Sequence, residues 1–245
     1  MLRLVSFVVF LTTWWVAALL VDTSKLPAPP VVLQALMTEA RSGALFLNLG
    51  ATLARVALSF TLAMTLGVAI GYLMGRVRLA NRLGDPWLIL LLNLPALVVI
   101  VLAYIWAGLT EVAAISAIAI NKLPAAVVNL REGTRALDTS LDEMATVFSI
   151  TRFRAFRHII LPQLAPYIAA AARSGLSLVW KIVLVAELLG RPNGVGFEIG
   201  VAFQLFDTPR LLAYSLSFAA VVLLIETALV QPFESRVNRW RVRAA

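Results

Sequence analysis

Long apolar runs alternate with short polar stretches along almost the whole chain. A run of about 20 apolar residues is long enough to cross the hydrocarbon core of a bilayer as an α-helix. The pattern therefore predicts an all-α integral membrane protein with about six transmembrane helices. The predicted spans are Leu4 to Val21, Ala51 to Gly75, Pro86 to Thr110, Val112 to Leu130, Tyr167 to Leu189 and Leu211 to Val230.

The first run has a second interpretation, because a basic start and an apolar stretch also describe a cleaved signal peptide. We favour a retained span, since the run is long and Trp14-Trp15 makes a poor cleavage region. After a Pro-rich connector, the segment from Val31 to Leu49 predicts an amphipathic, partly interfacial helix. Gly67, Gly71 and Gly75 recur every four residues, which predicts close contact with another helix.

The later runs carry their own breaks. Pro95 predicts a kink in the third span, because proline cannot donate a helical hydrogen bond. The fourth span is the weakest of the set, since it contains Lys122 and Pro124. The stretch from Gly190 to Arg210 is interrupted by glycine and proline and predicts an outer loop.

Composition supports the membrane class and excludes several chemistries. Hydrophobic residues make up 61% of the chain and charged residues 14%, a balance typical of integral membrane proteins. The chain has no cysteine, which excludes disulfides and thiolate metal sites, and His158 is its single histidine. No metal site is therefore expected. The net charge of +8 is explained by topology before nucleic-acid binding, because the positive residues crowd the loops beside the spans.

Positive charge orients the spans, since cytoplasmic loops are enriched in arginine and lysine. With both termini inside, the outer side holds Lys25, Arg41, Arg191 and Arg210. The cytoplasmic side then holds Arg3, Arg76, Arg78, Arg82, Arg131, Arg135, Arg152, Arg154, Arg157, Arg236, Arg239, Arg241 and Arg243. This asymmetry predicts cytoplasmic termini and a cytoplasmic loop over residues 131–166.

That loop is among the few long polar stretches of the chain. Its central stretch starts with Asp142 and Glu143, becomes basic, and ends at Pro162. Three apolar residues recur in it at helical spacing, with arginines between them: Phe153, Phe156 and Ile160. The pattern predicts two short helices outside the membrane, each with an apolar side available to a partner.

The order of residues through this loop carries a resemblance. Glu143 and Ala145 are followed by Ser149, and the stretch closes on Ile159, Leu161 and Pro162. The set is completed upstream by Asn129 and Gly133, and downstream by Trp180, Val185 to Gly190 and Gly194 to Gly196. Over roughly residues 50–240 the chain resembles ABC importer permeases, in particular a subgroup that imports sulfonates, taurine, nitrate or similar solutes. Met144 and Ser149 depart from the family pattern, which has alanine and glycine there.

The resemblance implies a type I ABC importer permease-like fold, with residues 1–50 as an N-terminal span and connector before a transmembrane domain over 51–240. It implies a bacterial inner-membrane protein that partners ATPase subunits and an extracytoplasmic binding protein, and that binds no cofactor itself. Few spans per copy favour a homodimer. The residues expected to couple the chain to the ATPase are Glu143, Met144, Ala145, Ser149, Phe153, Phe156, Ile159, Leu161 and Pro162. Small Ala145 is expected to let its helix approach a groove closely.

Two of these residues have competing interpretations. Glu143 either anchors the start of the coupling helix, where the helix dipole favours a carboxylate, or is an ordinary acid of a helix N-terminus. Ser149 either adopts a left-handed conformation, at a cost of about 1–2 kcal/mol, or caps the helix that follows it. We expect the cap.

The sequence contains no phosphate-binding loop of the G-x-x-x-x-G-K-[ST] type, no nucleophile elbow and no paired carboxylate that stands out. The chain is therefore not expected to be an enzyme, and ATP hydrolysis is expected in a separate subunit. A secondary transporter or channel driven by an ion gradient is the alternative function. An inverted repeat would support it, but the sequence contains no convincing internal repeat.

Ionisable residues inside spans are expensive and are functional candidates by default. Lys181, Glu187 and Glu226 qualify, whereas Arg55 and Arg173 are expected to reach the interface from span ends. Interhelical ion pairing is the competing explanation for the three. The candidate pathway residues are Asn93, Trp106, Trp180, Lys181 and Glu187. Asparagine and tryptophan in spans serve more often in core packing or as interfacial anchors, which is the competing explanation for the first three. Cations in or near the spans outnumber acids, which favours an anionic solute.

Overall fold

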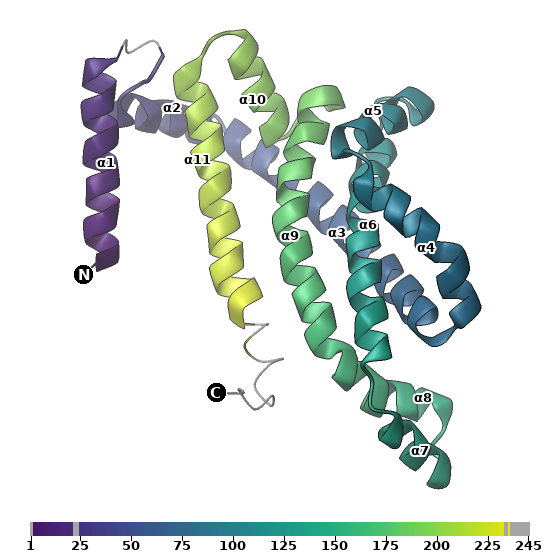
Figure 1. The fold of residues 1–245 in the computed structure, drawn as a ribbon. Coiled ribbons are helices and arrows are strands. Elements are labelled where there is room, and N and C mark those ends of the chain that lie inside the picture. The colour runs from purple at the N-terminus through teal and green to yellow at the C-terminus, as the bar shows by residue number, and fades with distance from the viewer. Residues whose placement is uncertain (1, 22–24, 233–234, 236–245) are drawn as a thin grey trace. The chain divides into compact units, whose positions relative to one another are not determined.

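The structure is a computed structural model that describes residues 2–21, 25–232 and 235 of the chain (Figure 1). Every regular element in these residues is a helix, which confirms the predicted all-α class. The elements are α1 Leu2–Leu20, α2 Pro29–Arg41, α3 Ala44–Arg76, α4 Arg78–Asn93, α5 Ala96–Ala107, α6 Glu111–Arg135, α7 Thr139–Val147, α8 Arg152–Ala155, the π-helix η1 Phe156–Ile160, α9 Leu161–Gly190, α10 Val195–Gln204, α11 Thr208–Ile225 and the π-helix η2 Glu226–Val230.

The chain divides into two compact units, each built from two stretches of sequence. Unit 1 comprises Met1–Ala54 and Leu184–Leu223, and unit 2 comprises Arg55–Val183 and Leu224–Ala245. The boundaries fall inside α3, α9 and α11. Each unit therefore joins segments that are distant in the sequence.

In unit 1, the predicted amphipathic helix ends earlier than expected. α2 begins with two prolines and ends at Arg41, and Gly43 then adopts a left-handed φ of +80°. A glycine in this conformation terminates a helix at little cost. The expected helix from Val31 to Leu49 is thus wrong in its second half, and α3 starts at Ala44, before the predicted span.

The predicted outer loop between the fifth and sixth spans also contains a helix. α10 begins after Gly194 and has several buried residues, among them Val195, Glu198 and Ala202. Gly196 lies against the backbone of Leu184, and Gly194 and Gly200 lie against the side chains of Glu187 and Leu188. The glycines therefore mark a packed turn, which the sequence alone does not separate from a loop.

In unit 2, α3 packs against α6 through its glycines. A Cβ atom at Gly67 would collide with Ala126, and one at Gly71 with Leu130. Gly75 lies in the same way against Thr134. The predicted close contact along this stripe is confirmed.

The third predicted span is not one kinked helix. α4 and α5 meet at Leu94 and Pro95 with a bend of 100° between their axes. Proline cannot donate a hydrogen bond and favours an extended residue before it, and Leu94 is extended with ψ 126°. The irregularity lies at Pro95, as predicted, but it is a sharp turn between two helices and not the expected kink within one.

Among the described residues, four helical stretches are long and apolar enough to cross a membrane: Ala44–Arg76, Glu111–Arg135, Arg152–Gly190 and Thr208–Val230. The α4–α5 pair brings this number to five if it is one broken span. α1, with 19 residues, covers most of the first predicted span. Its part Leu11–Leu20 is a shorter apolar helix, below the length of the four long stretches. The span expected to be weakest, α6, has the largest buried share of the four.

The predicted pair of short helices is only half right. α7 is separate, but the second segment is the start of a continuous helix of 39 residues, Arg152–Gly190. Its π turn, η1, ends two residues before Pro162, and the Leu161 amide donates to the carbonyl oxygen of Phe156. π turns and prolines are common sources of local irregularity in long helices.

Candidate functional site

α7 starts and ends with defined caps. Asp138 is its N-cap, and the carboxylate Oδ1 accepts hydrogen bonds from the Ser140 hydroxyl at 2.6 Å and the Ser140 amide at 2.9 Å. The bond from the hydroxyl, and to a lesser degree the bond from the amide, hold the pKa of Asp138 below its ordinary value. Glu143 lies one turn further on, so the acid at the helix start is Asp138, and the prediction that gave Glu143 this place is wrong.

The backbone at the end of α7 shows why glycine is the usual residue at position 149. Ser149 has a φ of +51°, its amide donates to Thr146 at 3.0 Å, and the Ile150 amide donates to Ala145 at 2.9 Å. This pair of bonds is a Schellman motif, whose left-handed position is usually glycine. The N-cap of α8 is Thr151. The expectation that Ser149 caps the second helix is therefore wrong, and the strained alternative is the one observed.

The segment from α7 to η1, hereafter the α7–α8 module, does not expose its apolar side chains along the single side that the spacing predicted. Ala145 and Ile160 are 7% and 8% exposed, so they pack inside. Phe156 is partly covered by an edge-on contact with Tyr72, with ring centroids 5.8 Å apart. The exposed apolar set, hereafter the α7–α8 surface, instead consists of Met144, Val147, Phe148 and Phe153.

Two expectations are wrong for the same physical reason: the shared apolar side of the second segment, and the close approach of Ala145 to a partner. Spacing placed Phe153, Phe156 and Ile160 on one helical side, but the second segment continues into α9 and buries the side that faces its own unit. Ala145 is buried in the same way, so a bulky residue there would disturb the module itself. Val147 and Phe148, which sequence reasoning missed, are 79% and 72% exposed and signal the surface more clearly.

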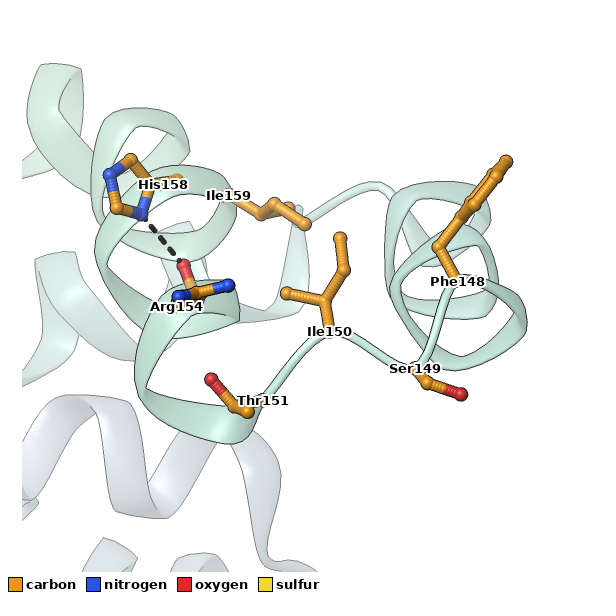
Figure 2. Close-up of a pocket in the computed structure, with 7 residues that line it drawn as sticks. All are labelled: Phe148, Ser149, Ile150, Thr151, Arg154, His158 and Ile159. Atoms are coloured by element: carbon orange, nitrogen blue, oxygen red, sulfur yellow. Dashed lines mark hydrogen bonds between the residues drawn. The ribbon is translucent and has the colours of Figure 1, made fainter.

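A hollow of about 350 Å³ lies between α7 and α8 (Figure 2). It is lined by Phe148, Ser149, Ile150, Thr151, Arg154, His158 and Ile159. Figure 2 shows the Ile150 and Ile159 side chains in the space between the two helices. Nδ1 of His158 lies 3.1 Å from the carbonyl oxygen of Arg154, which ties the ring back to its own helix.

The remaining predicted coupling residues lie around this module. Glu143 is exposed on α7, Ile159 is half-buried in η1, and Leu161 and Pro162 are exposed at the start of α9. The structure thus brings most of the predicted set to one end of unit 2, where α6 passes into α7 (Figure 1).

Most ionisable groups in the spans are paired. The Arg55 guanidinium, 3% exposed, donates to both carboxylate oxygens of Glu111 at 2.9 and 2.7 Å. Arg55 therefore does not reach the interface from a span end, as was expected, but is fixed by a bidentate ion pair. Arg173 lies 3.6 Å from Glu226, as the pairing explanation predicted for that acid.

Glu187 belongs to a buried polar network in unit 1. Its carboxylate oxygen Oε2 accepts from the Thr52 hydroxyl at 2.9 Å and from the Gly196 amide at 2.8 Å. The Asn48 side chain accepts from the Gly194 amide at 2.8 Å and donates to Glu198 at 2.9 Å.

Further members close this network. The Val195 amide donates to Thr52 at 2.8 Å, and Arg210 donates to Glu198 at 2.8 Å. Tyr214 donates to Glu39 at 2.8 Å, and Arg210 lies 3.3 Å from the same acid. We call the whole set the Glu187 network. Glu187, a candidate pathway residue, is fully buried within this network.

Two lysines in the spans of unit 2 have opposite environments. Lys122 is 1% exposed, and the end of its side chain occupies the space that a side chain at Gly175 would need. Lys181 is exposed on α9, as are Ser174 and Ser177. These three positions are three and four residues apart, so they share one face of the helix.

The other predicted pathway residues do not gather at one place. Asn93 is exposed and donates to the carbonyl oxygen of Ile89 at 2.7 Å, within its own helix. Trp106 is 78% exposed at the end of α5, and Trp180 is 6% exposed in α9. Within the described part of the chain, no cluster of three His, Asp or Glu side chains is arranged for a metal ion.

Comparison with known proteins gives consistent results. Residues 63–237 match the family model described as binding-protein-dependent transport system inner membrane component. A probable ABC transporter permease protein of Brucella abortus is 31% identical, over 99% of this chain and 96% of that protein. A putative aliphatic sulfonates transport permease protein of Bacillus subtilis is 33% identical, over 90% of this chain and 80% of that protein.

A solved structure supports the fold. One chain of an amino acid ABC transporter crystallised with histidines superposes with a TM-score of 0.65, covering 82% of this chain and 97% of that one. The two sequences are 20% identical, so the likeness concerns the arrangement of helices alone.

Proposed function

Because the chain belongs to the family of binding-protein-dependent transport system inner membrane components, we propose that two copies of it form the pathway of an ABC importer for a small oxyanion. As a permease subunit it is a multi-pass inner-membrane protein, it binds no cofactor itself, and ATP is hydrolysed by a partner subunit. A binding protein outside the membrane delivers the solute to it. This membership decides against the secondary transporter or channel that the sequence left open.

The α7–α8 surface is the proposed docking site for the ATPase. Its four side chains are apolar and exposed. They precede the long apolar stretch of α9, so they would face water and not lipid. Exposed apolar side chains of this kind mark interaction sites in soluble regions. The charge asymmetry of the loops supports a cytoplasmic position for this end and for both termini, although Arg236 to Arg243 lie outside the described residues.

The observation that carries the proposed pathway is the polar face of α9. An exposed lysine in a span costs about 2.5–3.5 kcal/mol on insertion scales if it faces lipid. Lys181, with Ser174 and Ser177 on the same side, is therefore better placed against a second copy or an aqueous path. A cation beside two hydroxyl groups suits an oxyanion, since a lysine and a hydroxyl can both donate hydrogen bonds to its oxygens. In the structure the hydroxyls of Ser174 and Ser177 donate to backbone carbonyl oxygens of α9, so they would turn from these to reach a solute.

The solute class follows from this chemistry and from the relatives. The Bacillus subtilis relative is named for aliphatic sulfonates. A sulfonate carries a full negative charge at neutral pH and three acceptor oxygens, which one lysine and two serines can satisfy in part. We therefore propose an organosulfonate, taurine included, as the solute.

Uptake of a labelled aliphatic sulfonate tests this assignment, with the permease reconstituted in proteoliposomes with its ATPase and binding protein. A hydrogen bond to a charged group contributes about 1.5–3 kcal/mol, so Lys181→Gln is expected to reduce uptake about 10-fold or more. Lys181→Arg should retain most of it. Lys25→Gln, which removes an exposed lysine outside the spans, is the matched control. Equal uptake by Lys181→Gln and Lys25→Gln would remove Lys181 from the path.

A further inference from the structure

A second concave site lies at the start of α4. A hollow of about 330 Å³ is lined by Met74, Gly75, Arg78, Asn81, Arg82 and Arg135. Its apolar floor comes from the end of α3, and its polar wall comes from the first turns of α4 and the last residue of α6. All six lining residues belong to unit 2.

The hollow is strongly cationic because the neighbouring acids are already engaged. Asp85 and Glu132 both accept from Arg131, and Glu132 also accepts from Arg135 at 3.1 Å. None of the lining residues is acidic.

Two of the lining arginines remain available. Arg78 and Arg82 are exposed, and neither makes a side-chain hydrogen bond or ion pair with a described residue. They are four residues apart, so their guanidinium groups lie on one side of α4. Two forked donors side by side match the oxygens of a phosphate group.

The same helix carries an exposed apolar stripe. Leu79, Leu83 and Trp87 are 66%, 65% and 67% exposed, and they recur every four residues. Each leucine directly follows one of the two arginines, so the stripe runs beside the cationic face. Trp87 is typical of positions where a helix crosses the membrane–water interface.

We propose that this hollow binds the headgroup of an anionic phospholipid, whose acyl chains lie along the stripe formed by Leu79, Leu83 and Trp87. A free phosphate or a soluble anion would use the arginines but not the stripe. Basic pockets between membrane helices on the cytoplasmic side suit anionic lipid headgroups. An acidic segment of the ATPase is the competing occupant, since α6 leads from this hollow directly into α7.

Native mass spectrometry of the detergent-purified permease, alone and with its ATPase, tests the proposal with short-chain phosphatidylglycerol as the probe. The double variant Arg78→Gln/Arg82→Gln is expected to lower apparent phosphatidylglycerol affinity about fivefold for each arginine at low salt. Lys25→Gln/Arg41→Gln, which removes two exposed charges from unit 1, should bind like the unmodified protein. Leu83→Ser should weaken binding of the lipid but leave any binding of inorganic phosphate unchanged.

Three outcomes would overturn the proposal. Equal binding of phosphatidylglycerol and phosphatidylcholine would show that charge is not recognised. Full competition by millimolar inorganic phosphate, with no effect of Leu83→Ser, would identify a soluble-anion site. Loss of the ATPase from Arg78→Gln/Arg82→Gln with unchanged lipid binding would assign the hollow to the partner subunit.

Discussion

The Glu187 network and the α7–α8 surface place their side chains in opposite environments. In the network, polar groups are buried and paired: Glu187 is fully buried, and its carboxylate accepts two hydrogen bonds. On the α7–α8 surface, apolar groups are exposed: Val147 and Phe148 are 79% and 72% exposed. Buried polar groups must find partners within the protein, whereas exposed apolar groups gain by finding one outside it.

The comparison separates two kinds of residue that sequence reasoning treated alike. Glu187 and Phe153 were both functional candidates, one because a charge in a span is expensive and the other because an apolar side chain in a polar loop is unusual. The structure assigns Glu187 to holding α10 in place within unit 1. It leaves Phe153 available for contact with another molecule.

The largest expected effect comes from breaking the network at Gly194. This residue has φ +110° and ψ 166°, a conformation that is essentially restricted to glycine, and a Cβ atom there would collide with the Glu187 carboxylate. Gly194→Ala is expected to cost about 3 kcal/mol or more, from backbone strain and disrupted buried hydrogen bonds. Thermal unfolding of the detergent-purified protein measures the loss.

Gly43→Ala is the matched control for this change. Gly43 is also left-handed, at φ +80°, but a Cβ atom added there would meet no other atom within 4 Å. Its substitution should cost only the conformational penalty of about 1–2 kcal/mol. If both variants lose the same stability, the contact with Glu187 contributes nothing, and the network is weaker than its geometry indicates.

The next effect concerns the exposed surface. Phe148→Asp is expected to weaken ATPase binding about 30-fold or more, as for a central aromatic residue of an interface. Its melting temperature should be unchanged, because the side chain has little contact with its own chain. Pulldown of the ATPase and thermal unfolding are the two measurements. Leu109→Asp, at a residue that precedes α6 and is 63% exposed, is the control and should bind normally. Normal binding by both variants would refute docking at this surface.

Much of the fold follows from the sequence because the relevant signals are local. Apolar runs define the long helices, Pro95 defines the break between α4 and α5, and Gly67 and Gly71 define the contact with α6. Each of these depends on the residue type at one position or on a short repeat. Such patterns are visible without knowing which segments meet.

The site is less predictable because it depends on distant neighbours. Asn48 and Gly194 are 146 residues apart and meet through a hydrogen bond that no spacing indicates. Lys122 and Lys181 look alike in sequence, but only Lys122 faces a glycine that leaves room for its side chain. Burial of Ala145 and Ile160 likewise depends on how the module folds onto its own unit.

The smallest expected effect comes from substitutions of Ser149, which test whether this residue is strained at the end of α7. A left-handed serine costs about 1–2 kcal/mol relative to a right-handed one, and glycine removes most of this cost. Ser149→Gly is therefore expected to stabilise the end of α7 by about 1 kcal/mol, whereas Ser149→Ala should be nearly neutral, because alanine and serine are strained alike. A capping serine would give the reverse order, with Ala costing about 1 kcal/mol and Gly nearly neutral. Hydrogen exchange of the Ser149 and Ile150 amides, which close the Schellman motif, measures this local change directly. Thr151→Gly, at a residue with an ordinary φ of −61°, should not slow exchange at these amides, because it relieves no strain.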